Sequence, residues 1–412
     1  MKNFKRHLLA LSSILFFGNI YGQSDTVVKS NITIAETEAK PKAKWYDNIS
    51  LRGYMQVRYN RLLETNPLLK CDQCDRSWGE NGGIFVRRMR LVFSGQLTDR
   101  IYFYIQPDFA SAPSSTAQNF AQIRDMYVDL GFDKKNEFRV RLGQSKVPFG
   151  FENMQSSQNR LTLDRNDALN SAVANERDLA AFFYWAPESA RKRFSSLISE
   201  GLKGSGDYGV FGFGVYNGQT ANRPEQNNNL HIVGRLSYPI EAGNQTIEPS
   251  IQAYKGKYVV TNDQLSPGVK VKPGNNYDDE RVAASLILYP RPFGVQAEYN
   301  IGRGPEFNNV TDSIETQKLK GGYVTLNYMM KAKKHFIYPF AKVQYYSGGK
   351  KHETDARSYS VREYELGVEW QPLKNFELVA QYTISKRRFE DFKNQNNTQK
   401  GNLLRLQAQL NF

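Results

Sequence analysis

Basic side chains recur at every second position in several segments of the chain. Arg88 is followed by Arg90, and Arg139 by Arg141, with an apolar residue between the two members of each pair. A guanidinium group stays charged, and its planar fork binds oxyanions through two parallel hydrogen bonds. Arginines spaced in this way would line an anion-binding surface. The basic residues that share this polar face are Arg52, Arg58, Arg88, Arg90, Arg139, Arg141, Arg235 and Lys342.

Carboxylates occupy the same polar face, so both signs of charge are present. A mixed surface of this kind also suits a generic polar channel wall, in which opposite charges brace each other without selecting an ion. An anion-preferring surface and a non-selective one therefore both stay open. The acidic residues with this parity are Asp108, Asp125, Asp129, Glu298, Glu363, Glu365, Glu369 and Glu377.

Enzymatic chemistry has little support in the sequence. A hydrolase needs a nucleophile, a base and a group that orients the base. The candidate bases are His231, His335 and His352, and none falls in a recognisable Ser/His/Asp context. We therefore expect no enzyme, with an outer-membrane hydrolase as a weaker alternative.

The two cysteines form a single Cys-x-x-Cys sequence, Cys71 and Cys74. In an exported chain a local disulfide is the default expectation. A structural zinc site needs four ligands, and the four histidines of the chain are not close to one another in sequence. We expect a disulfide between these cysteines, no metal and no cofactor.

The elements that must position these residues are strands. In the last segment, 402–412, Leu404, Leu406, Leu410 and Phe412 fall on one face, and polar residues fall between them. Period-two alternation is typical of an amphipathic strand. A chain that ends on such a strand with a terminal aromatic residue looks like an outer-membrane barrel that closes on its first strand. The terminal residue also resembles the signal by which the barrel-assembly machinery recognises its clients.

Composition agrees with a barrel. The 412 residues have a mean hydropathy of −0.60, yet include 24 Tyr and 25 Phe. This pairing is unusual for a soluble core and natural for a barrel with a polar lumen and aromatic girdles. The formal net charge of +14 would also suit nucleic acid, anionic lipid or anionic solutes. Export makes nucleic acid an unlikely partner and favours outer-membrane lipid and small anionic or polar solutes.

The amino-terminal region has the pattern of a signal peptide. Three basic residues precede an apolar run at 8–17, and small residues follow before position 23. Ten apolar residues are too few to span a bilayer as a helix. We expect a signal peptide at 1–22, a flexible periplasmic leader at 23–48 and a transmembrane barrel at 49–412.

Alternation predicts sixteen strands, an even number that suits closure of a bacterial barrel. Short connectors alternate with long ones, which include 61–81, 150–178, 258–280, 304–320, 348–360 and 387–401. This alternation is typical of periplasmic turns and extracellular loops. The expected strands lie near 49–60, 82–96, 101–110, 121–132, 137–146, 179–187, 207–217, 230–239, 246–257, 281–290, 293–302, 321–331, 335–347, 361–371, 375–386 and 402–412. The fold class is thus an all-β transmembrane antiparallel barrel.

The connector 150–178 is the longest, and such loops are usually functional or disordered. It carries Arg160, Asp164, Arg165 and Asp167 together with enough apolar residues to fold against a surface. A loop that folds into the barrel and narrows it is one hypothesis. An extracellular flap is the other.

Four stretches resemble one family, the phosphate-selective porins O and P. They are the segments 85–95, with Arg87-Arg88-Met89-Arg90, and 141–152, with Pro148-Phe149-Gly150-Phe151-Glu152, then Leu161 to Asn166 and the terminal strand around Arg405. The resemblance covers most of the chain after the signal peptide, and the second stretch is its most specific part. It implies a sixteen-stranded homotrimeric channel with an inward-folded third loop.

By this likeness, Arg87, Arg88 and Arg165 match arginines that line the constriction for anions, with Arg90 and Arg141 nearby on the same face. Alternation places Arg87 toward lipid, unless a bulge re-aims it. The chain departs from the family at Asn153, where the phosphate-binding members have a lysine. Loss of this cation argues against phosphate selectivity and leaves the porin prediction intact. The alternatives are a general non-selective porin and a plugged structural barrel.

Overall fold

The computed structural model describes residues 45–71, 78, 83–110 and 119–412. The predicted signal peptide and nearly all of the predicted leader lie outside these residues. The last four residues of the leader form a short 3-10 helix, η1 (Trp45–Asn48), directly before the first strand. Among the described residues, no helix is both long and apolar enough to cross a membrane.

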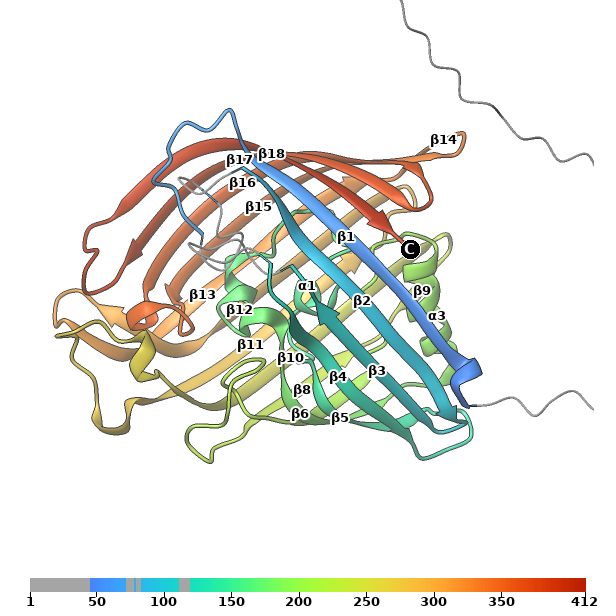
Figure 1. Ribbon diagram of the computed structural model, residues 1–412, viewed down its shortest axis with the longest axis horizontal. Coiled ribbons are helices and arrows are strands. Elements are labelled where there is room, and N and C mark those ends of the chain that lie inside the picture. The colour runs from blue at the N-terminus through green and yellow to red at the C-terminus, as the bar shows by residue number, and fades with distance from the viewer. Residues whose placement is uncertain (1–44, 72–77, 79–82, 111–118) are drawn as a thin grey trace, which may run out of the picture. The chain divides into compact units, whose positions relative to one another are not determined.

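The described chain forms one closed antiparallel sheet, with strands that are tilted against the long axis (Figure 1). Its eighteen segments make sixteen strands, because β9 continues β8 against β10, and β14 continues β13 against β15. The segments are β1 (Ile49–Leu62), β2 (Ile84–Thr98), β3 (Ile101–Asp108), β4 (Gln122–Gly131), β5 (Phe138–Lys146), β6 (Arg177–Trp185), β7 (Phe211–Tyr216), β8 (His231–Ser237), β9 (Ile240–Ala242), β10 (Gln245–Val259), β11 (Asn276–Leu288), β12 (Phe293–Asn308), β13 (Ser313–Tyr328), β14 (Met330–Ala332), β15 (His335–Gly349), β16 (Ser358–Leu373), β17 (Phe376–Glu390) and β18 (Thr398–Asn411).

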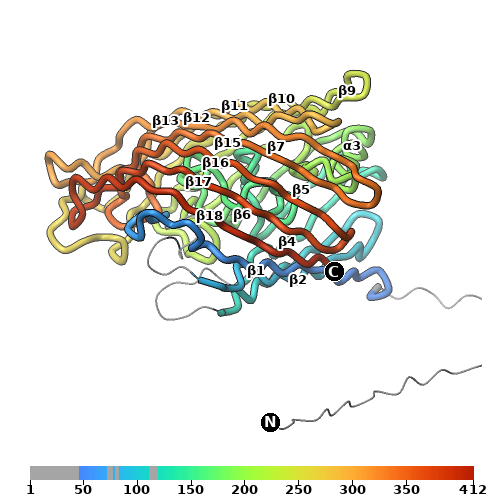
Figure 2. The backbone as a smooth tube through the Cα atoms, turned by 90° about the horizontal axis from the view of Figure 1, so that it is seen from above, coloured from blue at the N-terminus to red at the C-terminus, as the bar shows by residue number. Residues whose placement is uncertain are grey.

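The terminal strand closes the barrel, as its alternation predicts. Strand β18 pairs with β1, and Phe412 and Gly53 exchange two backbone hydrogen bonds of 2.7 and 2.9 Å. Figure 2 shows β1 and β18 side by side along the wall. Closure leaves no unpaired edge, which a membrane-spanning sheet requires.

The wall is polar on its inner face and apolar on its outer face. Along β16, Leu366 and Trp370 are exposed on the outside, whereas Glu365 and Glu369 are buried on the inside. The largest fully buried side chains include Arg58, Arg281, Arg387 and Arg405. This inversion of a soluble core is the pattern of an outer-membrane barrel.

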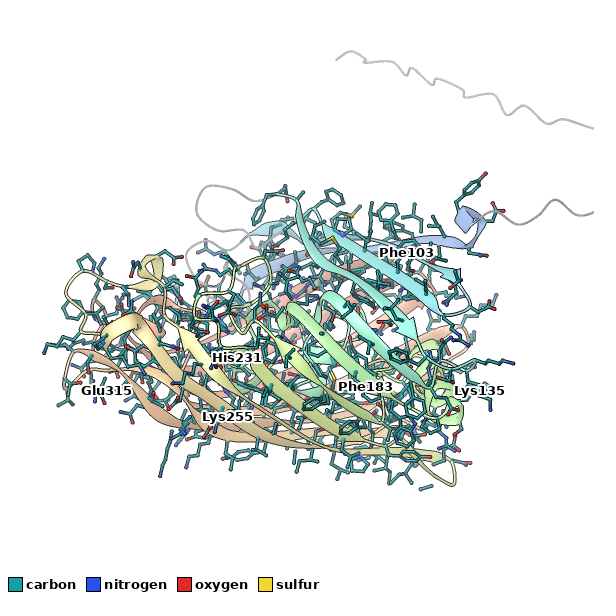
Figure 3. The ribbon with its side chains drawn as sticks, turned by 90° about the horizontal axis from the view of Figure 1, so that it is seen from below. Phe103, Lys135, Phe183, His231, Lys255 and Glu315 are labelled. Atoms are coloured by element: carbon teal, nitrogen blue, oxygen red, sulfur yellow. The ribbon has the colours of Figure 1, made fainter. Side chains whose placement is uncertain are left out.

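The two ends of the barrel differ. At one end, here called the short-turn end, most connections have a few residues; the other is called the long-loop end. Figure 3 labels Lys135 near the short-turn end and Glu315 near the long-loop end. One connection at the short-turn end is long: the chain between β6 and β7 carries the helix α3 (Glu188–Ser199). Arg191 of this helix donates to the carbonyl oxygens of Lys135 and Asn136, in the turn between β4 and β5, which places α3 at this end.

The other helices are short and lie in loops. They are α1 (Phe151–Met154), α2 (Asp167–Asn170), η3 (Ala174–Glu176), η4 (Asn262–Gln264), η5 (Pro273–Asn275) and η6 (Thr354–Ala356). The predicted loop 304–320 is wrong, because β12 and β13 continue to a turn at 309–312. Outside the bilayer a strand needs no apolar face, so the alternation that marks it in sequence fades there.

Candidate functional site

A β-bulge on β2 turns two consecutive arginines into the lumen. Gln56 of β1 pairs with Arg88, whereas the next residue, Val57, pairs with Val86. Arg87 is therefore the extra residue of the bulge. Both arginines are buried, as are the inward residues before and after them. Strict alternation would have placed Arg87 toward lipid, and the bulge removes that conflict.

The segment 147–176, between β5 and β6, lies inside the barrel, and Figure 1 shows α1 in the interior. It crosses to the far wall, where the Lys342 ammonium lies 2.8 Å from the Glu152 carboxylate. The backbone N–H of Phe151 donates to Glu298 at 2.6 Å. These bonds attach the start of the segment to β12 and β15.

The same segment has a second set of anchors. The Asp164 carboxylate contacts Arg58 on β1 at 3.4 Å and also pairs with Arg405 on β18. Asp167 pairs with Arg387 on β17 at 2.9 Å. All of these groups are buried, and breaking such a pair strands a charge in a poorly solvated place. The segment is therefore held across the lumen by charge on both sides, and it narrows the channel.

Four arginines gather where this segment faces β2. Arg87 and Arg88 come from the bulge, and Arg160 and Arg165 come from the segment. Each is between 4 and 8% exposed, and Arg88 and Arg165 both feel the positive charges of Arg87 and Arg160. We call these four residues the arginine cluster.

Charge compensation inside the arginine cluster is incomplete. Arg165 pairs with Glu176, but Arg88 donates to the neutral Gln56 side chain at 2.8 Å and Arg160 to the carbonyl oxygen of Thr162 at 3.3 Å. Within the described ranges no carboxylate forms an ion pair with Arg88 or Arg160. The carboxylates of Glu152 and Asp164 still act on Arg160 through space, so Arg88 is the member with the least compensation. A cation of this kind in a narrow lumen attracts anions.

Electrostatic crowding is visible at Arg165, one of the two loop members of the cluster. Burial lowers the pKa of Arg165 well below its usual value, and the charges of Arg160, Arg177 and Arg87 lower the pKa further. A bound anion would relieve this repulsion, because it adds negative charge among these cations.

Arg90 and Arg141 also face the lumen, but carboxylates compensate them. Arg90 donates to Asp108 at 2.8 Å. Arg141 makes two bonds to Asp129, at 2.7 and 2.8 Å, and its guanidinium lies 3.9 Å from the centre of the Tyr127 ring. Both arginines therefore brace the wall. Of the five predicted site residues, the cluster contains Arg87, Arg88 and Arg165, and Arg90 and Arg141 lie outside it.

Asn153 is fully buried in α1 and does not face an open channel. Its Nδ2 donates to the carbonyl oxygen of Phe149 at 3.1 Å and to that of Leu169 at 3.4 Å. Its Oδ1 has no hydrogen-bond partner. The residue thus holds the fold of the segment together at the place where the phosphate-binding members have a cation.

A chamber of about 610 Å³ lies on the short-turn side of the segment. Tyr104 and Tyr127 stack in its wall with ring centres 5.1 Å apart. The chain after α3 lines it with Ser205, Asp207 and Tyr208. This chain is held in place by the ion pair between Lys203 and Glu369 at 2.5 Å and by a hydrogen bond from Gln155 to the carbonyl oxygen of Lys203. Chain segments therefore enter the lumen from both ends, and the chamber lies between them.

Several buried cations that anchor the segment were missing from the expected set. Arg281 donates to the carbonyl oxygen of Ala168 at 2.9 Å, and Arg387 lies in a predicted loop. The signal was present for Arg387, since the alternation of Gln381, Thr383 and Ser385 continues to it. Arg160 lies in a loop, where no alternation of residues indicates whether its side chain points into the lumen.

Two further expectations concern single residues. Cys71 is disulfide-bonded, while Cys74 lies outside the described residues. His231 contacts Asp279 at 3.1 Å and lies among Tyr216 and Tyr254. Figure 3 labels His231, and no described Ser, Thr or Cys side chain is hydrogen-bonded to its ring.

A closed antiparallel barrel of sixteen strands, with an apolar outside and a polar lumen narrowed by one inserted segment, defines an outer-membrane porin. The family model described as phosphate-selective porin O and P matches residues 70–412. The chain belongs to this family, and it is an outer-membrane protein that lets small solutes pass.

Solved structures show the same fold at low identity. An anion-selective porin from Comamonas acidovorans has 12% identity and a TM-score of 0.51, over 88% of this chain and 99% of that chain. Salmonella typhi OmpF in complex with daunomycin has 13% identity and a TM-score of 0.53, over 89% and 98%. Vibrio cholerae OmpT has 8% identity and a TM-score of 0.50, over 88% and 97%. A comparison with curated proteins finds no match.

Proposed function

We propose that the protein is a passive channel that prefers small anions and has no enzymatic activity. The arginine cluster carries this proposal, because no described carboxylate forms an ion pair with Arg88 or Arg160, and Arg88 bonds to the neutral Gln56 side chain. The similar barrel from Comamonas acidovorans is described as anion-selective, which agrees with it. Because Asn153 stands in place of the family's lysine, we propose oxyanions in general as solutes, without a strong preference for phosphate.

The test is the reversal potential of single channels in a salt gradient across a planar bilayer. The wild-type protein should favour chloride over potassium, and Arg88→Gln with Arg160→Gln should move the potential toward the cation side. Arg303→Gln with Lys255→Gln removes the same charge from the outer wall and should change nothing. A wild-type potential that favours cations would contradict the proposal.

A second candidate is a plugged structural barrel. It is favoured by the contact between the two segments that fill the lumen, where Gln155 donates to the carbonyl oxygen of Lys203. Planar-bilayer recordings separate the two, because a plugged barrel inserts and conducts nothing. A hydrolase would instead release product from lipid or ester substrates in detergent.

We further propose the route and the assembly of the protein. Residues 1–22 act as a signal peptide, residues 23–48 as a periplasmic leader, and the long-loop end faces the outside of a Gram-negative type of cell. Family likeness supports a homotrimer. The amphipathic β18 that ends at Phe412 supports recognition by the barrel-assembly machinery, and detection of a trimer after crosslinking tests the oligomeric state.

A further inference from the structure

Basic side chains form a row on the outer wall, toward the long-loop end. Arg362 on β16 pairs with Lys386 on β17, which pairs with Lys400 on β18. On β13, Lys318 and Lys320 point outward in the same part of the wall. All five residues are exposed. We call these five residues the basic row.

The basic row has no ion-pair partner in the part of the chain that the structure describes. On the neighbouring strands, Arg303 and Lys255 share Glu280 at 2.8 and 3.6 Å, and Lys257 lies 3.9 Å from Asp278. In contrast, no described carboxylate forms an ion pair with any member of the basic row. Its positive charge is therefore free for a ligand.

The basic row lies at the border of the apolar band. Below Arg362 the outward residues of β16 are Tyr364, Leu366, Val368 and Trp370. Ten strand residues span about 33 Å along the strand, or about 25 Å along the bilayer normal at the usual tilt, which is the height of the apolar band of such barrels. Arg362 is thus at the level of lipid headgroups.

A hollow of about 710 Å³ begins at the row and runs over β11 to β16. Small outward residues make it, among them Ala284, Ala297 and Gly322. A Cβ at Gly322 would lie 2.1 Å from the carbonyl oxygen of Glu298, so this position has no room for a side chain and the outer surface is recessed there. The lining on its outward side is otherwise apolar, and Arg362 lies at its edge. Its volume and its largely apolar outward lining fit an acyl chain.

The opposite wall lacks this feature. Among the described outward residues of β2 to β8, which include Phe183 on β6, there is no lysine or arginine. Figure 3 labels Phe183 on β6 and Lys255 on β10. Among the described outward residues of the strands, this group of basic side chains toward the long-loop end is therefore confined to one side of the barrel, which a general need for solubility does not explain.

We propose that the basic row and the hollow bind a phosphorylated membrane lipid, with its phosphates on the row and an acyl chain in the hollow. Clusters of basic residues at headgroup level recognise anionic lipid headgroups. A free phosphate would use the row alone, whereas the adjoining apolar hollow adds a site that only a lipid fills. The site is separate from the lumen and from solute passage.

The experiment measures lipid binding to the full protein, purified in detergent, by native mass spectrometry. The probes are diphosphorylated lipid A and the same lipid with its phosphates removed. The variant Lys320→Gln, Arg362→Gln, Lys386→Gln should bind the phosphorylated probe about a hundredfold more weakly, since each basic residue near an anionic lipid surface contributes roughly fivefold. The matched control Lys331→Gln, Lys333→Gln, Lys334→Gln removes the same charge at the short-turn end and should bind as the wild type does.

A second variant tests the hollow. Ala284→Trp with Ala297→Trp fills it and keeps every charge, so it should weaken binding of both lipids by a similar factor. Equal binding of the two lipids to the wild type overturns the proposal, and so does unchanged binding to the charge variant. If the charge variant instead changes the subunit number at constant lipid affinity, the row is a contact between copies of the chain and the proposal is wrong.

Discussion

Arg87 and Arg88 are adjacent in the chain, yet both side chains face the lumen, because Arg87 is the extra residue of a β-bulge on β2. A bulge inserts one residue without changing the face of the residues beyond it. The strand therefore presents two cations to the channel in the space where regular pairing allows one.

Deletion of Arg87 should remove the bulge and leave the barrel intact. Val86 and Arg88 would then alternate regularly, so Arg88 would stay in the lumen and one cation would be lost. We expect normal assembly, seen as a heat-dependent gel shift, and a reversal potential moved toward the cation side. Leu91 pairs regularly with Gly53. Its deletion would move the inward side chains of one part of β2 to the outer face and should abolish assembly.

Glu152→Gln should loosen the inserted segment. The change leaves the Lys342 ammonium buried without its partner, and loss of one member of a buried ion pair costs about 3–5 kcal/mol. Single-channel currents should become larger and noisier. The double variant Glu152→Gln, Lys342→Met removes both charges and should be quieter than the single one; equal noise in both would contradict the role of the pair.

The same pair predicts a pH dependence. Burial acts to raise the pKa of Glu152, but the Lys342 ammonium, together with the Arg160 charge and the Asn166 N–H, outweighs it, and the net pKa lies below the usual 4.5. A lowered pKa stabilises the segment above pH 4.5, and this contribution is lost as the pH falls through the lowered value. Current noise should therefore stay constant from neutral pH to about 4.5 and rise only in stronger acid. Glu152→Gln should show the noise at every pH.

Lys203→Met should open the short-turn end. Lys203 holds the chain after α3 against Glu369 at 2.5 Å, and both side chains are buried. We expect a higher single-channel conductance, because the chain after α3 loses the ion pair that holds it against the wall at Glu369. Lys192→Met breaks an exposed pair with Glu188 on the same helix and should leave conductance unchanged. A conductance equal to the wild type in both variants would show that the pair does not gate the lumen.

Asn153→Lys should lower stability without creating phosphate selectivity. Asn153 is fully buried and bonded to the carbonyl oxygens of Phe149 and Leu169, so an ammonium there lacks a counter-charge and costs several kcal/mol. Thermal unfolding should begin at a lower temperature than in Asn153→Met, which has no charge. Block of the chloride current by phosphate should stay as in the wild type. A new block at low phosphate would show that this position alone decides selectivity.

Strand positions could be predicted because apolar and polar residues alternate along every membrane-spanning strand of a barrel. Each predicted strand overlaps an observed one, from β1 at Ile49 to β18 at Asn411. The alternation of apolar and polar residues is lost beyond the apolar band. The ends of β12 and β13 extend into that region, so their polar residues were predicted as a loop. The helix α3 was also missed, because most connections at that end are short.

Alternation of apolar and polar residues by itself determined that this chain is a barrel, which residues face the lumen and that arginine is prominent among them. Local pairing decided that Arg87 joins Arg88 inside, because a bulge leaves no mark in a period-two pattern. Arg141 meets Asp129 because the two residues lie directly opposite each other on the neighbouring strands β5 and β4. Only the tertiary structure decided that Arg160 and Arg165 meet Arg87 and Arg88. These relationships depend on where a long loop ends in space, and that place is set by buried ion pairs between residues far apart in sequence.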